Sequence, residues 1–86
     1  MSKRFHKTLF PGFAEAAQRR QSLASALASR RLELGLSQTE VAARMGTSQS
    51  AVARLESGAS DARLSTLERY AIAVQMKLEV SLRSDV

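Results

Sequence analysis

Between residues 13 and 34 the apolar residues recur at the three- and four-residue spacing that places them on one face of a helix. They are Phe13, Ala16, Ala17, Leu23, Ala24, Leu27, Ala28 and Leu34. Gly35 ends the pattern, and Arg30 and Arg31 lie just before it, where cations suit the helix dipole. The pattern leaves open whether this segment is one helix or two helices broken near Ser22.

Two short helices follow. A Ser-x-x-Glu capping box at Ser37 and Glu40 predicts the start of the first, and Gly46 its end. The second is capped by Thr47 or the serine after it, and Gly58 ends it. Helices of about eight residues are too short to be stable alone, so the two must pack on other parts of the chain.

A second capping box, at Ser65 and Glu68, predicts a helix from Thr66 to about Val74. We expect this helix to bury four apolar residues. They are Leu67, Ala71, Ile72 and Val74.

The period changes after this helix. Residues 77–83 alternate polar and apolar, which is typical of a half-buried strand with Leu78, Val80 and Leu82 on one face. A lone strand cannot satisfy its own backbone N–H and C=O groups. We therefore expect it to pair with the same strand of a second subunit, unless it is a frayed tail.

Residues 38–57 have the spacing of a helix-turn-helix. Ala42 is small enough for the crossing of two helices, and Gly46 suits a turn with a positive φ. The inward positions are Val41, Met45, Val52 and Leu55. The outward positions of the second helix, suited to a DNA major groove, are Gln49, Ser50, Ala53 and Arg54. The alternative is an ordinary helical hairpin in an all-α domain.

The run from Leu36 to Gly58 resembles the phage-repressor (Cro, XRE) family of DNA-binding domains, and the likeness covers about residues 21–76. The resemblance implies a mainly α fold of five helices. It also implies that Gln38 contacts the DNA backbone and the edge of the site, and that Ser48 and Ser57 contact phosphates. The base edges would be contacted by Gln49, Ser50 and Arg54. It further implies that Arg31 pairs with Glu56, near a phosphate. The loop before Arg63 carries Asp61 and is less basic than is usual in this family, which leaves phosphate contact there to Arg63 and backbone amides.

The C-terminal part is similar to HipB-type antitoxins, in which a terminal strand pairs across a dimer and a toxin protein is bound. We divide the chain into an N-terminal arm (1–20), a DNA-binding domain (21–76) and a dimerisation strand with its tail (77–86). Unlike some relatives, the chain has only three residues after the strand.

Charge adds a candidate partner. The net charge is +5, and residues 1–31 hold seven bases against the single acid Glu15. Such a polarised excess favours a polyanion, nucleic acid first. Lys3, Arg4 and Lys7 form either an arm on DNA phosphates or a disordered terminus. The neighbouring apolar residues either dock onto a partner protein or cover the domain's own core or dimer seam; they are Leu9, Phe10 and Phe13.

Other classes of function lack support. The chain has no Cys and a single His6, so the sequence predicts no metal site and no triad of catalytic residues. It contains no glycine-rich phosphate loop, no paired carboxylates, no apolar run long enough for a membrane and no signal peptide. We expect no cofactor and no enzyme activity, and a cytoplasmic, nucleoid-associated protein.

Two hypotheses remain at this point. The first is a homodimeric transcriptional repressor that binds double-stranded DNA at a palindromic operator. The second is an antitoxin that neutralises a toxin protein and represses its own operon.

Overall fold

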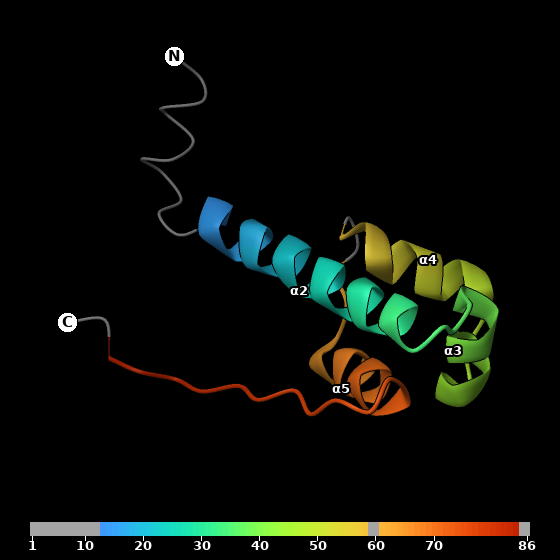
Figure 1. Cartoon of the computed structure of the whole chain (residues 1–86). Coiled ribbons are helices and arrows are strands. Elements are labelled where there is room, and N and C mark those ends of the chain that lie inside the picture. The colour runs from blue at the N-terminus through green and yellow to red at the C-terminus, as the bar shows by residue number, and fades with distance from the viewer. Residues whose placement is uncertain (1–12, 59–60, 85–86) are drawn as a thin grey trace, which may run out of the picture.

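The computed structural model describes residues 13–58 and 61–84. Within these ranges the chain forms four helices (Figure 1): α2 (Phe13–Glu33), α3 (Gln38–Met45), α4 (Gln49–Ser57) and α5 (Leu64–Ala73). The open question about the first segment is resolved, because α2 is one uninterrupted helix of 21 residues. The predicted limits of α3 and α4 are confirmed, each helix ending at a glycine with a positive φ.

The core lies where α2, α3, α4 and α5 meet. Val41, Val52, Tyr70 and Val74 are completely buried, one from α3, one from α4 and two from α5 and its end. Leu27 of α2 completes this cluster. Most of α2 therefore packs on the other helices, whereas its first turns extend beyond them (Figure 1).

The start of α5 differs from the prediction. The helix begins at Leu64, its N-cap is Arg63, and no side chain caps it. Ser65 lies inside the first turn, so its hydroxyl is not placed to accept from the amides that a capping residue serves. The predicted box of Ser65 and Glu68 is therefore wrong, although the helix itself is present.

The buried face of α5 also differs from the prediction at three positions. Ile72 is 73% exposed, whereas Tyr70 and Ala73, which were not expected in the core, are buried. Tyr70 lies three residues after Leu67 and four before Val74, so it belongs to the same stripe of the helix. Its hydroxyl made it a poor core candidate from sequence alone.

The described residues contain no strand, and neither a fifth helix nor the strand predicted at 77–83 is found among them. Residues 77–84 run away from the helices as an extended segment (Figure 1). Leu78 packs against the core, whereas Val80 and Leu82 are 63% and 98% exposed. A strand needs a neighbouring strand for its hydrogen bonds, and no other segment within 13–58 and 61–76 is extended alongside residues 77–83.

The expectations for Lys3, Arg4, Lys7 and Phe10 fall outside the described residues. In the described ranges no helix is long and apolar enough to cross a membrane.

Candidate nucleic-acid interface

The helix-turn-helix is built from α3, a turn and α4. Ser37 caps α3 reciprocally with Glu40: the Glu40 amide donates to Ser37 Oγ at 3.0 Å, and the Ser37 amide donates to Glu40 Oε1 at 2.8 Å. Gly46 ends α3 at φ 72°, a left-handed conformation that costs glycine little. Ser48 caps α4 by accepting from the Ala51 amide at 3.2 Å, which decides between the two predicted caps.

Small and apolar side chains fix how the two helices cross. Ala42 is 3% exposed and Met45 is 3% exposed, and both pack in one cluster with Val52. A larger residue at position 42 would separate the helices, because the core leaves no room for it. Leu55, also predicted to face inward, is half-buried against this cluster.

The opposite face of α4 points to solvent. Gln49, Ser50 and Arg54 are exposed, and Ala53 between them is half-buried. The side chain of Arg54 has no hydrogen-bond or ion-pair partner within the described ranges. Its guanidinium is therefore available to an external acceptor, as the sequence predicts for this face.

Gln49 is held by a neighbour from α3. Its Nε2 donates to Gln38 Oε1 at 2.7 Å, and Gln38 Nε2 in turn donates to Glu56 Oε1 at 2.9 Å. Both ends of the Gln38 amide group are therefore engaged inside the molecule. The structure gives Gln38 a role in orienting Gln49, which the sequence did not indicate.

Glu56 is the centre of a network that joins all four helices. Arg31 donates from Nε and Nη2 to the two carboxylate oxygens at 2.7 and 3.0 Å, and from Nη1 to the Leu36 carbonyl at 2.8 Å. The hydroxyl of Tyr70 donates to Glu56 Oε2. The side chains of Arg31 and Glu56 are only 11% and 9% exposed. The predicted Arg31–Glu56 pair is thus present, and its three guanidinium nitrogens all have internal partners.

The electrostatics follow from these contacts. Burial acts to raise the pKa of Glu56, but hydrogen bonds from Arg31, Tyr70 and Gln38 outweigh it and hold the pKa below the usual value. The hydrogen bond to Glu56 raises the pKa of Arg31. Burial, followed by the hydrogen bond to Glu56, raises the pKa of Tyr70. Glu56 is therefore a carboxylate and Tyr70 a neutral donor at neutral pH.

The remaining predicted contacts lie around the ends of α4. Ser48 Oγ is 3.2 Å from Ser50 Oγ at the N-terminal end. At the C-terminal end Ser57 Oγ donates to the Arg54 carbonyl at 2.7 Å. Arg63, beyond the loop, is exposed. Ser48 and Ser57 thus flank α4, the positions at which phosphate contacts were expected.

Two arginines have structural partners that the sequence did not indicate. Arg30 Nε donates to the Val74 carbonyl at 3.1 Å, and Arg44 Nη1 donates to the Ala73 carbonyl at 2.9 Å. Both satisfy carbonyls at the C-terminal end of α5, where cations also suit the helix dipole. Neither contact could be predicted from the sequence, because the residues joined are 44 positions apart for Arg30 and 29 positions apart for Arg44.

No cluster of three or more His, Cys, Asp or Glu side chains that could hold a metal ion occurs in 13–58 or 61–84. The outer face of α4 offers a different chemistry: one guanidinium, one oriented amide and hydroxyl groups. These groups can form hydrogen bonds with base edges in a major groove.

Comparison with known proteins agrees with this geometry. The helix-turn-helix family model HTH_3 matches residues 27–80, more than half of the chain. Two similar proteins bear the name Antitoxin HigA1, from Mycobacterium tuberculosis strains CDC 1551 / Oshkosh and ATCC 25618 / H37Rv. Each is 44% identical over 73 residues, covering 85% of this chain and 49% of the relative. The chain spans about half the length of these curated relatives. No solved structure matches it.

Proposed function

The chain belongs to the helix-turn-helix family, of the XRE type, and from this premise we propose that it is a DNA-binding antitoxin that represses its own operon. The observation that carries DNA binding is the exposed face of α4, where Arg54 lacks an internal partner and Gln49 is held in place by Gln38. The observation that favours the antitoxin role over that of a simple repressor is the identity to the HigA1 antitoxins.

In this proposal α4 enters the major groove. Arg54 has the fork geometry to donate to O6 and N7 of guanine, and the amide of Gln49 suits N6 and N7 of adenine. Gln49 donates one N–H to Gln38, which leaves its second N–H and its carbonyl oxygen for a base. Ser50 lies beside these two residues and completes the base-facing set.

Phosphate contacts fix the position of the protein on the duplex. We assign them to Ser48 and Ser57 at the two ends of α4 and to Arg63 beyond the loop. Residues Lys3, Arg4 and Lys7 of the arm add sequence-independent affinity. Gln38 and Arg31, which the resemblance also assigns to DNA, act chiefly by holding Gln49 and α4, because their polar atoms have internal partners.

The operator-bound form in this proposal is a homodimer. The tail segment 77–83 pairs with its copy about a two-fold axis, so that Val80 and Leu82 leave solvent. Ile72 and Met76, which are 73% and 46% exposed, extend the apolar surface from the tail onto α5. Contiguous exposed apolar surface of this kind marks an interaction site. A two-fold dimer binds a palindromic site with half-sites about 34 Å apart.

DNA binding is tested by selecting bound duplexes from random DNA with the full chain. The proposal expects enrichment of one palindromic sequence, and the variant Arg54→Ala should lose the base preference at one position of each half-site. Failure to enrich any sequence would contradict it. The matched control is Arg19→Ala, because Arg19 is an exposed arginine of α2, outside the helix-turn-helix.

The antitoxin role needs a separate test. The tagged chain is recovered from its native host after nuclease treatment, and the co-purified protein is identified and expressed alone. We expect that protein to arrest growth, and co-expression of this chain to restore growth. Recovery of no such protein, with operator binding intact, would leave a repressor without a toxin and would contradict the antitoxin role.

A further inference from the structure

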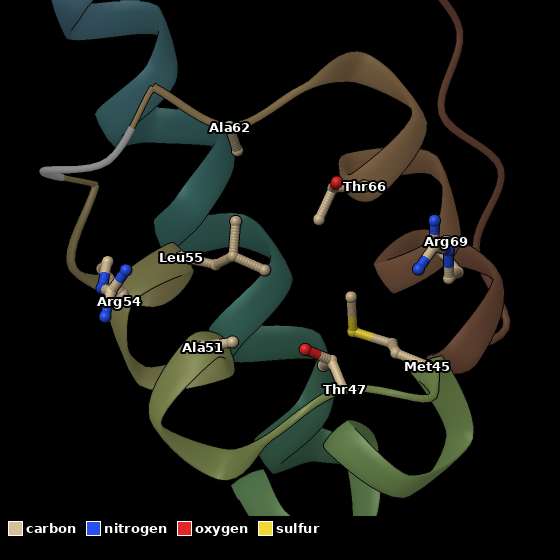
Figure 2. Close-up of a pocket in the computed structure, with 8 residues that line it drawn as sticks. All are labelled: Met45, Thr47, Ala51, Arg54, Leu55, Ala62, Thr66 and Arg69. Carbon is tan, nitrogen blue, oxygen red and sulfur yellow. The ribbon is translucent and has the colours of Figure 1, made fainter.

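A pocket of about 240 Å³ lies between α4, the turn before it and the start of α5 (Figure 2). Part of its wall is apolar and comes from segments distant in sequence. The apolar residues are Met45, Ala51, Leu55 and Ala62. The volume is somewhat below the roughly 300–1,000 Å³ of pockets for drug-sized ligands, so the space suits a small organic molecule.

The polar groups of the pocket are two cations and two hydroxyls. Arg54 and Arg69 stand on opposite sides of it, with Thr47 and Thr66 between them (Figure 2). No carboxylate is found among the described residues that line the pocket. Neither arginine has a hydrogen-bond or ion-pair partner within 13–58 and 61–84. Two positive charges therefore lie at the edges of the pocket, and no internal counter-charge pairs with either in the described residues.

We propose that this pocket binds a small organic anion with an apolar body, such as a short-chain carboxylate. The guanidinium groups match a carboxylate through charge-assisted, bidentate hydrogen bonds. The apolar wall gains from contact with hydrocarbon, which a small hydrated ion such as phosphate cannot supply. The guanidinium groups thus match the carboxylate of the ligand, and the apolar wall matches its hydrocarbon body.

The pocket shares Arg54 with the proposed base-reading face. A bound carboxylate that holds Arg54 competes with guanine for the same guanidinium, so the ligand lowers operator affinity. This consequence rests on the proposed DNA binding, whereas occupancy of the pocket does not. Because linkage is reciprocal, operator binding must lower the affinity of the protein for the ligand by the same factor.

Ligand binding is tested by recording backbone amide spectra of the full chain during titration with hexanoate. Hexanol, which lacks the charge, and inorganic phosphate, which lacks the apolar body, are the matched probes. We expect hexanoate to shift the amides of Ala51, Ala62 and Thr66, and to shift them more than either matched probe does. No shift with hexanoate, or equal shifts with phosphate, would overturn the proposal. The second result would leave only a subsite for an anion such as a DNA phosphate.

Two variants connect these shifts to the pocket. Arg69→Gln removes a charge at the rim and should weaken hexanoate about tenfold, since a charge-assisted bond is lost. Ala51→Leu fills the space and should also weaken hexanoate. The matched control Arg19→Gln makes the same charge change on α2 and should leave hexanoate affinity unchanged. If all three variants bound hexanoate as tightly as the wild-type protein does, the ligand would lie elsewhere and the proposal would be overturned.

The effect on DNA is measured as operator affinity with and without saturating hexanoate. We expect hexanoate to weaken operator binding by the wild-type protein, and to weaken it less for Arg69→Gln. Without hexanoate, the operator affinity of Arg69→Gln should match that of the wild type. Unchanged operator affinity at saturating hexanoate would overturn the proposal that the bound anion lowers DNA binding. Absence of operator binding without any ligand would contradict the proposed function instead, and the amide spectra would still decide whether the pocket binds the anion.

Discussion

Arg54 and Glu56 are two residues apart on α4 but have opposite environments. Arg54 is exposed and without an internal partner, whereas Glu56 is nearly buried and accepts hydrogen bonds from three side chains. One helix thus carries its candidate base contact on one face and its strongest anchor on the other. This separation allows the two roles to be tested independently.

We expect Arg54→Ala to weaken binding to the selected operator by about 1–3 kcal/mol and to weaken binding to random DNA much less. The reason is that a bidentate contact to guanine exists only at the right base. The measurement is fluorescence anisotropy on both duplexes. Equal losses on both would mean that Arg54 contacts phosphates and does not contact bases.

Glu56→Gln should lower the free energy of unfolding at about pH 7 by about 3 kcal/mol, because it leaves the nearly buried Arg31 without its counter-charge. The pH dependence has a definite sign. The pKa of Glu56 is lowered in the folded protein, so its stabilising effect is complete above the pKa of an unfolded glutamate and is lost as pH falls through the folded value.

Urea denaturation at about pH 7 and about pH 3 separates the two effects. The wild-type protein should lose more stability on acidification than Glu56→Gln does, because only the wild type has this carboxylate to protonate. An equal loss in both proteins would show that the network around Glu56 contributes nothing to acid sensitivity.

Prediction of single residues from the sequence succeeded where the family pattern names the position. It failed where a contact between helices is not part of that pattern. The Arg31–Glu56 pair came from the resemblance and is present. The contact of Gln38 with Gln49, and that of Tyr70 with Glu56, were not predicted. They depend on how α3 and α5 approach α4, which no local spacing encodes.

Helix starts illustrate the same limit at the scale of elements. The Ser-x-x-Glu pattern occurs twice, and only the copy at Ser37 forms a capping box. At α5 the chain enters the helix one residue before Ser65, so the same letters lie inside the first turn. A capping pattern predicts a nearby helix start, but the path of the preceding loop decides which residue becomes the cap.

The two serines provide a matched pair. Ser37→Ala should lower the free energy of unfolding by about 1 kcal/mol, because it removes the acceptor of the Glu40 amide. Ser65→Ala should change it by less than about 0.5 kcal/mol, as expected for an exposed position without a cap. Urea denaturation of both variants is the measurement. A cost at Ser65 as large as that at Ser37 would contradict the assigned start of α5.

On the scale of the whole molecule, the basic N-terminal third is less available to DNA than its charge suggests. Of its seven bases, Arg30 and Arg31 donate hydrogen bonds to groups inside the domain. Arg19 and Arg20 of α2 are exposed. Net charge thus indicated the class of partner, but contacts within the fold decide which charges can reach it.

The tail allows a test of the proposed dimer. Val80→Pro removes a backbone donor from the strand and should shift the protein from dimer to monomer, with weaker operator binding. Val80→Thr keeps the donor and the β-branched shape, and should remain dimeric. Sedimentation at micromolar concentration distinguishes them. A Val80→Pro variant that is still dimeric would place the seam on another surface, such as α2.

The outer face of α4 is proposed to recognise a DNA sequence. This proposal is tested most directly by titrating the full chain into the selected operator and into a shuffled duplex of equal length, at about 0.15 M salt, with anisotropy as the readout. We expect the protein to bind the operator at least about 1,000-fold more tightly than the shuffled duplex. Equal affinity for the two duplexes would contradict it.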